Sequence, residues 1–445
     1  MSDIIITPFP RPAKGEAHVP GSKSISNRAL MLGFLSEGEV EIRNLLQSED
    51  TEVLQTAFKE LGVPVQKGED HTTRIRGCAG LPPRSSGELY VANAGTVARF
   101  LPASLSLLPD GDFRFAGSEA MMKRPMAGLL DCLSALGASI DFSGEPGFFP
   151  FQLHSCGWKP DELAVDASRS SQILSGLLIA ATRAPHPMKF QLAGDTVSKP
   201  FVTMTTEMIR QFGGEVRFEH PFYSVSPGLT GPPNASYIVE PDASAASYFF
   251  ALPIAAGGST LIQNFPKNSL QGDLSFLDIL EEVGLSVTRT GERVDVCRSH
   301  AMRSVDADFN AFSDTFLTLA ALAPLLPGPT RIRGIGHTRH QETDRIAAMA
   351  NELRKLGQGV EESEDSLTIQ PNRERMIELT RQGPLSIKTY DDHRVAMSFA
   401  ILGSHDLHGN GEPWLRILNP ECCGKTFPTF FEELARMRSL THSHS

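Results

Sequence analysis

Apolar residues recur along this chain at helical spacing, in segments that end with Leu-Gly or a close variant. In the first segment, 50–62, Val53, Leu54 and Phe58 fall on one face of a helix, and Gly62 follows the last turn. A glycine in that place is typical of a helix C-terminus. Four further segments end in the same way, at Gly137, Gly213, Gly284 and Gly357, and a sixth without the glycine covers 425–437. The pattern predicts six amphipathic helices.

A second series of helical segments alternates with the first and is apolar around most of its circumference. Each segment begins with small or polar residues and continues with large apolar residues, which indicates a buried helix. The six segments cover 22–35, 93–108, 168–181, 242–256, 313–326 and 391–403. Stretches such as "GEVEIRNL" and "PTRIRGIG" lie between the helices and are expected to form strands.

Both series repeat every 69 to 79 residues, so the chain is predicted to contain six copies of one unit. This period is longer than solenoid repeats use, and an open array would need polar caps, so we expect two globular domains of three units each. Proline marks two crossings between them, in "HVPGSK" and "VEPDAS". We therefore expect an α/β protein in which an inserted domain, 21–240, holds repeats 1–3. A discontinuous domain, 1–20 plus 241–445, then holds repeats 4–6.

The composition is typical of a globular protein: of 445 residues, 40% are hydrophobic and 21% are charged. No apolar run is long enough to cross a membrane, and the first residues lack the pattern of a signal peptide. The six cysteines form no C-x-x-C pair and show no metal-ligand spacing. We therefore expect a reduced, cytoplasmic protein that holds no metal ion.

The net charge of −11 and the lack of a basic block argue against a nucleic-acid partner. A small anionic ligand is compatible with this charge, because basic residues in one cleft can hold an anion while the rest of the surface is acidic. We expect small-molecule substrates, no membrane partner and a monomer.

Charged and polar residues gather where the predicted helices begin. Taken one at a time they have ordinary explanations: a serine or aspartate is most often an N-cap, a lone arginine a solvated charge, and a lone histidine a structural group. However, the placement recurs in all six units, and N-capping does not require the basic residues beside the caps. Because helix N-termini also carry positive partial charge, the pattern predicts an anion site formed by several helix starts.

Eight segments, in order along the chain, resemble motifs of the 5-enolpyruvylshikimate-3-phosphate (EPSP) synthase family. They are "PGSKSISNRAL", "NAGTVARF", "KRPM", "DASRSSQ", "VSKPF", "ETDRI", "YDDHRVAMSF" and "KTFP". The resemblance implies the enolpyruvyl-transferase fold, with two domains of three βαβαββ repeats around an interdomain cleft that closes on substrate. It also implies transfer of the enolpyruvyl group of phosphoenolpyruvate to the 5-hydroxyl of shikimate 3-phosphate, with release of phosphate and no metal or organic cofactor.

The resemblance assigns roles by position, and the roles suit two anionic substrates whose charge must be neutralised from several sides. Asp314 is implied as the proton acceptor from the 5-hydroxyl and Glu342 as the proton donor to the methylene carbon, with Lys23 and His393 also in the catalytic set. The residues implied to bind shikimate 3-phosphate are Lys23, Ser24, Arg28, Ser170, Ser171, Gln172, Ser198, Asp314, His337 and Gln341. Those implied to bind phosphoenolpyruvate are Lys23, Gly95, Arg124, Gln172, Arg345, Arg394 and Lys425.

The chain departs from the family pattern at a few positions. Gln341 stands where many members carry a lysine, and an amide cannot balance charge. His337 stands where an asparagine is common, and a protonated His337 or His340 is a candidate to restore the positive charge. Phe201 replaces a tyrosine on the shikimate side, and Phe100 replaces a proline close to Gly95.

Three alternatives were weighed against this interpretation. The sister family that acts on UDP-N-acetylglucosamine generally carries a reactive cysteine in a loop that here reads "AGSEAMMKRPM", which has none. An enolpyruvyl transferase for a different small acceptor stays open, because Gln341 and Phe201 both lie on the acceptor side. A non-catalytic anion-binding relative is disfavoured because Asp314, Glu342 and the basic set are all present.

Overall fold

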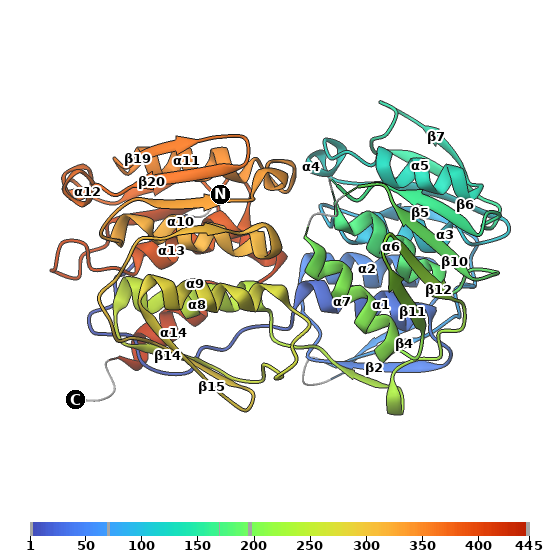
Figure 1. Cartoon of the computed structure of the whole chain (residues 1–445), viewed down its shortest axis with the longest axis horizontal. Coiled ribbons are helices and arrows are strands. Elements are labelled where there is room, and N and C mark those ends of the chain that lie inside the picture. Colours follow the sequence, from blue (N-terminus) through green and yellow to red (C-terminus); the bar gives the residue numbers. More distant parts are fainter. Residues whose placement is uncertain (1–2, 69–71, 169, 195–197, 442–445) are drawn as a thin grey trace. The chain divides into compact units, whose positions relative to one another are not determined.

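The computed structural model describes residues 3–68, 72–168, 170–194 and 198–441. The chain divides into two compact units, each with its own core (Figure 1). Unit 1 consists of Met1–Pro20 and Pro241–Ser445, and unit 2 consists of Gly21–Glu240. Within the described residues, no helix is long and apolar enough to cross a membrane.

Unit 2 contains three four-stranded sheets of one topology, in which one parallel pair is followed by two antiparallel pairings. Two of them follow the order βαβαββ without interruption. The first is β5 (Ser86–Tyr90), α3 (Val97–Leu105), β6 (Gly111–Ala116), α5 (Ala127–Leu136), β7 (Ser139–Phe142) and β8 (Phe151–Ser155), with a short α4 (Glu119–Met122) before α5. The second is β9 (Glu162–Val165), α6 (Ser171–Ala181), β10 (Met188–Leu192), α7 (Lys199–Gln211), β11 (Glu215–Glu219) and β12 (Phe222–Ser226).

The remaining sheet of unit 2 joins the two ends of the unit. Its strand β13 comes from the end of the segment and pairs in parallel with β2, which gives the sheet the same arrangement as the other two. The elements are α1 (Lys23–Leu35), β2 (Glu39–Arg43), α2 (Glu49–Glu60), β3 (Val65–Lys67), β4 (Thr73–Arg76) and β13 (Ser236–Ile238).

Unit 1 repeats this plan with variations. One repeat is complete, with β17 (Asp306–Asp308), the 3-10 turn η3 (Asn310–Thr315), α10 (Phe316–Leu322), β18 (Thr330–Arg333), α11 (Arg345–Lys355), β19 (Gly359–Glu362) and β20 (Ser366–Gln370). A second has α8 (Ala243–Ala256), β14 (Ser259–Ile262), η2 (Gly272–Ser275), α9 (Phe276–Val283), β15 (Leu285–Thr290) and β16 (Arg293–Arg298). Two isolated parallel β-bridges pair Ala13 with Gly258 and Glu16 with Leu261. The segment around Ala13 and Glu16 thus takes the position of the fourth strand in this sheet.

The last repeat of unit 1 closes the unit with the N-terminal strand, which pairs antiparallel with β22. Its elements are α12 (Arg373–Thr380), β21 (Leu385–Ile387), α13 (His393–Gly403), β22 (Leu415–Leu418), η6 (Pro420–Lys425), α14 (Phe430–Leu440) and β1 (Asp3–Ile6). Six copies of one unit, three in each half of the chain, are therefore present in the enolpyruvyl-transferase fold.

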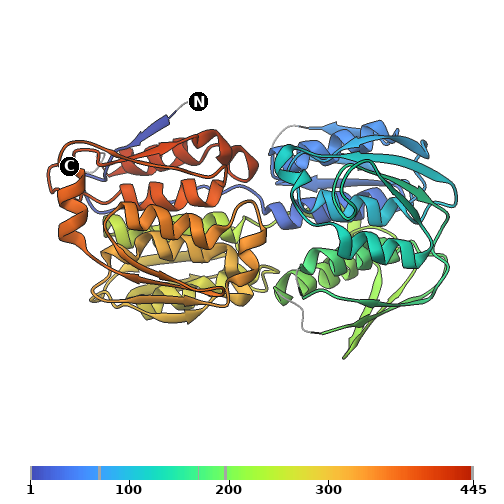
Figure 2. The ribbon, with the colours of Figure 1, turned by 90° about the horizontal axis from the view of Figure 1, so that it is seen from above.

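The helices of the second series form the centre of each unit. In unit 1, α8, α10 and α13 contact one another, and in unit 2 α3 packs on α6 with α1 beside them (Figures 1 and 2). Every residue of α10 is buried, and so are all but one of α8. These helices lack a polar face because sheets and other helices cover them on all sides.

The glycines that were expected to end the amphipathic helices have positive φ angles, between +76° and +120°. These residues are Gly62, Gly137, Gly213, Gly284 and Gly357. Left-handed backbone of this kind ends a helix at low cost only when no Cβ is present. The prediction of helix ends at these glycines is therefore confirmed.

The helices of the structure differ in detail from those predicted. The segment expected to be helical from 313 begins with η3, so that Asp314 lies in a 3-10 turn and α10 begins at Phe316. The helix α12 was not predicted, because its sequence is polar around most of its circumference and has no strong apolar stripe.

Candidate active site

The guanidinium of Arg345, at the start of α11, is the centre of a charged cluster in unit 1. Its Nε donates to Asp392 Oδ2 at 2.8 Å, its Nη1 to Asp314 Oδ1 at 2.9 Å, and its Nη2 to Glu342 Oε2 at 2.8 Å. The Arg345 side chain is 2% exposed. Burial alone lowers the pKa of Arg345, but the three carboxylates outweigh burial and raise it. The guanidinium therefore keeps its charge and fixes three acidic side chains around itself.

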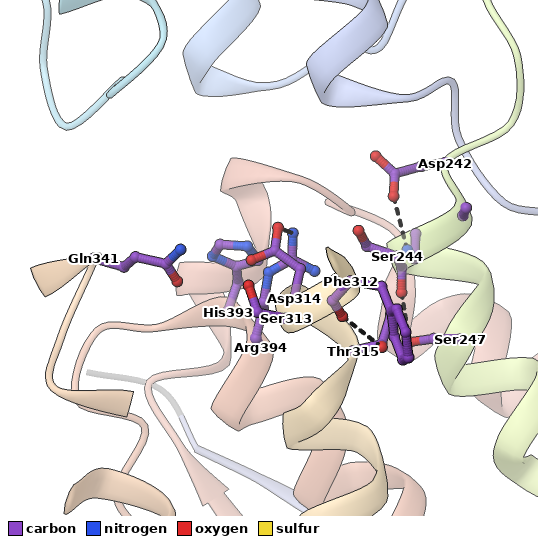
Figure 3. A network of polar contacts seen from close by, with 12 residues as sticks. Asp242, Ser244, Ser247, Phe312, Ser313, Asp314, Thr315, Gln341, His393 and Arg394 are labelled. Carbon is purple, nitrogen blue, oxygen red and sulfur yellow. Dashed lines mark hydrogen bonds and ion pairs between the residues drawn. The ribbon is translucent and has the colours of Figure 1, made fainter. Parts of the chain in front are cut away.

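Two further cations extend the cluster. Arg394 Nη2 donates to Asp314 Oδ2 at 2.6 Å, and Lys425 Nζ donates to Glu342 Oε1 at 2.9 Å. Each of the two carboxylates assigned to proton transfer is thus held by two cations, because both also bind Arg345. Such charge-assisted bonds fix the orientation of a carboxylate as well as its charge. Figure 3 shows Asp314 with Arg394 and His393 beside it.

Local sequence explains how these side chains reach one place. Asp392 is the N-cap of α13, and its Oδ1 accepts from the backbone N–H of Arg394 while its Oδ2 holds Arg345. Asp344 caps α11 in the same way, accepting from Ala347 N at 3.0 Å. Capping by an aspartate fixes where a helix begins, and so fixes the direction of the charged residue that follows it. Asp392 was missed by the sequence analysis as a member of the site, although it stands directly before His393 in "YDDHRV".

His393 lies at the first position of α13 and is completely buried. Its Nδ1 is 3.8 Å from Asp392 Oδ1. The ring therefore lies in the same cluster as Asp314 and Arg394 (Figure 3).

Gln341 and His337 lie at the edge of this cluster. The Gln341 side-chain oxygen accepts a hydrogen bond from Arg345 Nη1, so the amide acts as an acceptor toward the arginine. His337 Nε2 is 2.8 Å from Ser313 Oγ. Burial lowers the pKa of His337, while the charge of Asp314 opposes this shift only in part. The lowered pKa favours the neutral form of His337, and so it disfavours this ring as a replacement for the missing lysine charge.

Arg28 is the main cation of unit 2 that the sequence analysis selected, and it is 1% exposed. Its Nε donates to Thr205 Oγ1 at 2.8 Å, and its two Nη atoms donate to Ser24 O, Ser175 Oγ and Phe201 O. Burial lowers the pKa of Arg28 to about 9, so the guanidinium remains charged at neutral pH. Since all of these partners are neutral oxygens, the positive charge is available to an anionic ligand.

The Arg28 guanidinium also lies over the Phe100 ring, 5.3 Å from its centroid. A cation over an aromatic face is attracted by the ring. Phe100, which departs from the family pattern, therefore contacts a residue expected to bind substrate. Lys23 and Ser24 stand at the start of the same helix, α1, and both are half-buried.

A second group of unit 2 surrounds Gly95. Arg124 Nη1 lies 3.4 Å from Asn93 O, and Arg99 donates to Gly95 O at 3.3 Å and to Pro125 O at 3.0 Å. Arg99 and Arg124 thus join the loop before α3 to the loop before α5. These contacts bring Gly95 and Arg124 together, as their shared assignment to phosphoenolpyruvate requires.

The serines of the second and third repeats begin helices. Ser170 Oγ accepts from Gln172 N at 3.3 Å, which makes Ser170 an N-cap of α6, and Ser171 is the first residue of that helix. Ser198 precedes α7 and has a φ angle of +50°. The ordinary explanation of these residues as helix starts is therefore correct for Ser170. It does not prevent their side chains from binding an anion, because the helix N–H groups lie beside them.

No cluster of three or more His, Cys, Asp or Glu side chains suited to a metal ion occurs within the described part of the chain. The charged cluster of unit 1 pairs three carboxylates with three cations. The cations are Arg345, Arg394 and Lys425, and the carboxylates are Asp314, Glu342 and Asp392.

Comparison with known proteins shows the family to which this chain belongs. The family model described as EPSP synthase (3-phosphoshikimate 1-carboxyvinyltransferase) matches residues 9–434. The 3-phosphoshikimate 1-carboxyvinyltransferase of Opitutus terrae is 43% identical over 447 residues, covering 98% of this chain and 98% of the relative. The protein of that name from a Sulfurovum species is 39% identical over 442 residues, covering 99% of this chain and all of the relative.

Solved structures have the same fold. An EPSP synthase from Acinetobacter baumannii superimposes with a TM-score of 0.78 at 26% identity, over 98% of both chains. The enolpyruvyl transferase NikO from Streptomyces tendae gives a TM-score of 0.75 at 18% identity, over 97% of this chain and 96% of that one. At that identity, the second likeness concerns the fold alone.

Proposed function

Because this chain belongs to the EPSP synthase family, we propose that its two groups of buried cations divide the binding of shikimate 3-phosphate and phosphoenolpyruvate, and that Asp314 and Glu342 move the protons. The protein transfers the enolpyruvyl group of phosphoenolpyruvate to the 5-hydroxyl of shikimate 3-phosphate and releases phosphate. The residue roles below are the proposed part. The main observation that supports these roles is that Arg345 donates hydrogen bonds to both Asp314 and Glu342.

The addition step needs a base and an acid. Asp314 accepts the proton of the 5-hydroxyl as that oxygen bonds to C2 of phosphoenolpyruvate, and Glu342 donates a proton to the methylene carbon, C3. A tetrahedral intermediate results. In the elimination step the ionised Glu342 takes a proton back from C3, and the C2–C3 double bond forms again. The C2–O bond to phosphate breaks with its electron pair staying on the phosphate, which receives the proton held by Asp314. Two carboxylates held in different ionic surroundings suit these two roles.

Arg345, Arg394 and Lys425 have the charge needed for the carboxylate and phosphate of phosphoenolpyruvate. In the structure they are paired with Asp314 and Glu342. A bound anion shares these cations with the two acids, so binding prepares the acids for proton exchange. Arg124 beside Gly95 supplies a further cation from unit 2.

Shikimate 3-phosphate is assigned to the helix starts of unit 2. Arg28 offers a buried charge with neutral partners, and Lys23 and Ser24 stand one turn before it on α1. Ser170, Ser171, Gln172 and Ser198 stand at the starts of α6 and α7, where backbone N–H groups favour a phosphate. On the unit 1 side, His337 and Gln341 are assigned to the same substrate.

Phosphate release by the purified protein tests the proposal. We expect release only when both substrates are present. In Asp314→Asn and Glu342→Gln, kcat should fall by about 10²–10⁴-fold, while the affinity for either substrate changes far less. The exposed Glu361→Gln in β19 is the matched control and should behave like the unchanged protein. Full turnover in Asp314→Asn would overturn the proton-acceptor role, and release with a different acceptor alone would overturn the acceptor assignment.

The proposal further takes the protein to act as a cytoplasmic monomer. Its free cysteines are typical of a protein kept in a reducing compartment. Sedimentation of the purified full chain tests the monomer, with a dimer mass as the contrary result.

A further inference from the structure

Asp273 is a buried carboxyl group with no role in the mechanism above. It lies in η2, the 3-10 turn before α9, and is 5% exposed. Its Oδ1 has no hydrogen-bond partner among the described residues. A buried carboxyl oxygen without a partner costs free energy, so stability alone does not explain an aspartate at this position.

The surroundings of Asp273 are the ends of the three central helices of unit 1. The turn η2 packs against η3, which carries Asp314, and against α8, whose N-cap is Asp242. The charges of Asp314, Arg394 and Asp242 all act on the Asp273 carboxyl group. Ser244, also at the start of α8, contributes a hydrogen bond to its carboxyl group. Figure 3 shows these partners around Asp314, with Asp242 and Ser244 at the start of α8.

These neighbours decide the charge of Asp273. Burial and the negative charges of Asp314 and Asp242 raise its pKa to about 7, against the opposing effect of Arg394 and the Ser244 hydrogen bond. Asp273 therefore changes its charge near neutral pH. Since repulsion between two carboxylates is mutual, an ionised Asp273 also makes Asp314 hold a proton more tightly.

We propose that Asp273 is a positioning residue that acts through Asp314 and Arg394: its negative charge strengthens Asp314 as a base and shares Arg394 with it. The inference rests on the proposed role of Asp314 as proton acceptor. A base that holds its proton more tightly takes it more readily from the 5-hydroxyl. Without the negative charge of Asp273, Arg394 stabilises the ionised form of Asp314 more strongly. Asp314 is then a weaker base.

The test compares kcat/KM in the unchanged protein and in Asp273→Asn between pH 6 and 8.5, because kcat/KM reports the groups of the free enzyme. Asparagine imitates the neutral form of Asp273. The kcat/KM of the unchanged protein divided by that of Asp273→Asn should therefore be near one at pH 6 and rise to about ten at pH 8.5. The phosphates of the substrates titrate equally in both proteins, so they cancel in the ratio.

The exposed Asp278→Asn, in α9, is the matched control, and its ratio should stay near one at every pH. A ratio for Asp273→Asn that does not change with pH would indicate a merely structural effect and overturn the inference.

If Asp273→Asn does not fold, Ser244→Ala replaces it. Loss of that hydrogen bond disfavours ionised Asp273, so the ratio should be largest near pH 7 and return toward one at higher pH. A flat ratio in Ser244→Ala would likewise contradict the inference.

Asp314→Asn separates this inference from the proposed function. If that variant keeps full turnover, the proton-acceptor role fails and the inference fails with it. If Asp314→Asn loses turnover but the Asp273→Asn ratio is flat, only the inference about Asp273 fails.

Discussion

A Cβ atom on Gly95 would lie 2.7 Å from Nη2 of Arg124. The guanidinium therefore occupies the space that a larger residue at position 95 needs, and the two residues lie side by side. Arg124 can reach its present position only beside a glycine.

We predict that Gly95→Ala displaces the Arg124 guanidinium and raises KM for phosphoenolpyruvate by about 10-fold, the effect of weakening one charge-assisted hydrogen bond. The kcat value and KM for shikimate 3-phosphate should change little. Steady-state kinetics with each substrate varied in turn measures this. Gly87→Ala is the control, because no atom lies within 4 Å of a Cβ at Gly87. An unchanged KM in Gly95→Ala would show that Arg124 does not bind phosphoenolpyruvate.

Asp392 stabilises the charged cluster of unit 1. Replacing it with alanine removes the partner of Arg345 Nε and the cap of α13 together. We expect Asp392→Ala to lower the free energy of unfolding by about 3 kcal/mol or more, because a buried guanidinium loses a carboxylate. Thermal unfolding should show a fall in Tm on the order of 10 °C. Asp392→Asn keeps a capping oxygen and should lose less, and the exposed Glu374→Ala in α12 should lose almost nothing. Equal Tm values for Asp392→Ala and Glu374→Ala would contradict this account.

His337 gives a prediction for the pH dependence of stability. Its pKa is lowered by burial in the folded protein, so the unfolded chain binds the proton more readily. Folding is then opposed once the pH falls below the ordinary histidine pKa of about 6.5, and the stabilising contribution is complete above that pH. Denaturant unfolding at pH 5.5 and pH 7.5 should show a smaller loss of stability on acidification in His337→Asn than in the unchanged protein. His300→Asn, at an exposed position, is the control and should show the full loss. If His337→Asn loses as much stability on acidification as the unchanged protein, then His337 does not contribute to that loss.

Gln341 tests how the site works without the lysine that many relatives carry. Lysine at this position cannot accept the hydrogen bond that Arg345 donates to Gln341, but it adds a positive charge beside Glu342 and Asp314. We expect Gln341→Lys to lower KM for phosphoenolpyruvate several-fold and to lower kcat, because the new ammonium competes for the two acids. Gln341→Met removes the amide without adding charge and separates the two effects. Identical kinetic constants for Gln341→Lys and the unchanged protein would remove the charge argument.

The sequence by itself determined the repeated unit and the helix ends. Local conformational physics decides these features: Gly62 and Gly357 end helices because only glycine enters the left-handed region at low cost. The residues of α10 are almost all apolar, so their burial could be predicted without knowing which elements cover the helix. The motifs in order along the chain also identified the family, which the comparisons confirmed.

Only the tertiary structure decided the electrostatics of the site. Asp392 and Asp273 stand in ordinary capping and turn sequences, and nothing local distinguishes them from the exposed Asp278. Arg345 and Arg394, which act on them, come from other repeats of the unit. His337 was one of two candidates for the missing positive charge, and its burial favours the neutral ring. Burial and charge pairing depend on which segments meet in space, so residue type and spacing along the chain cannot supply them.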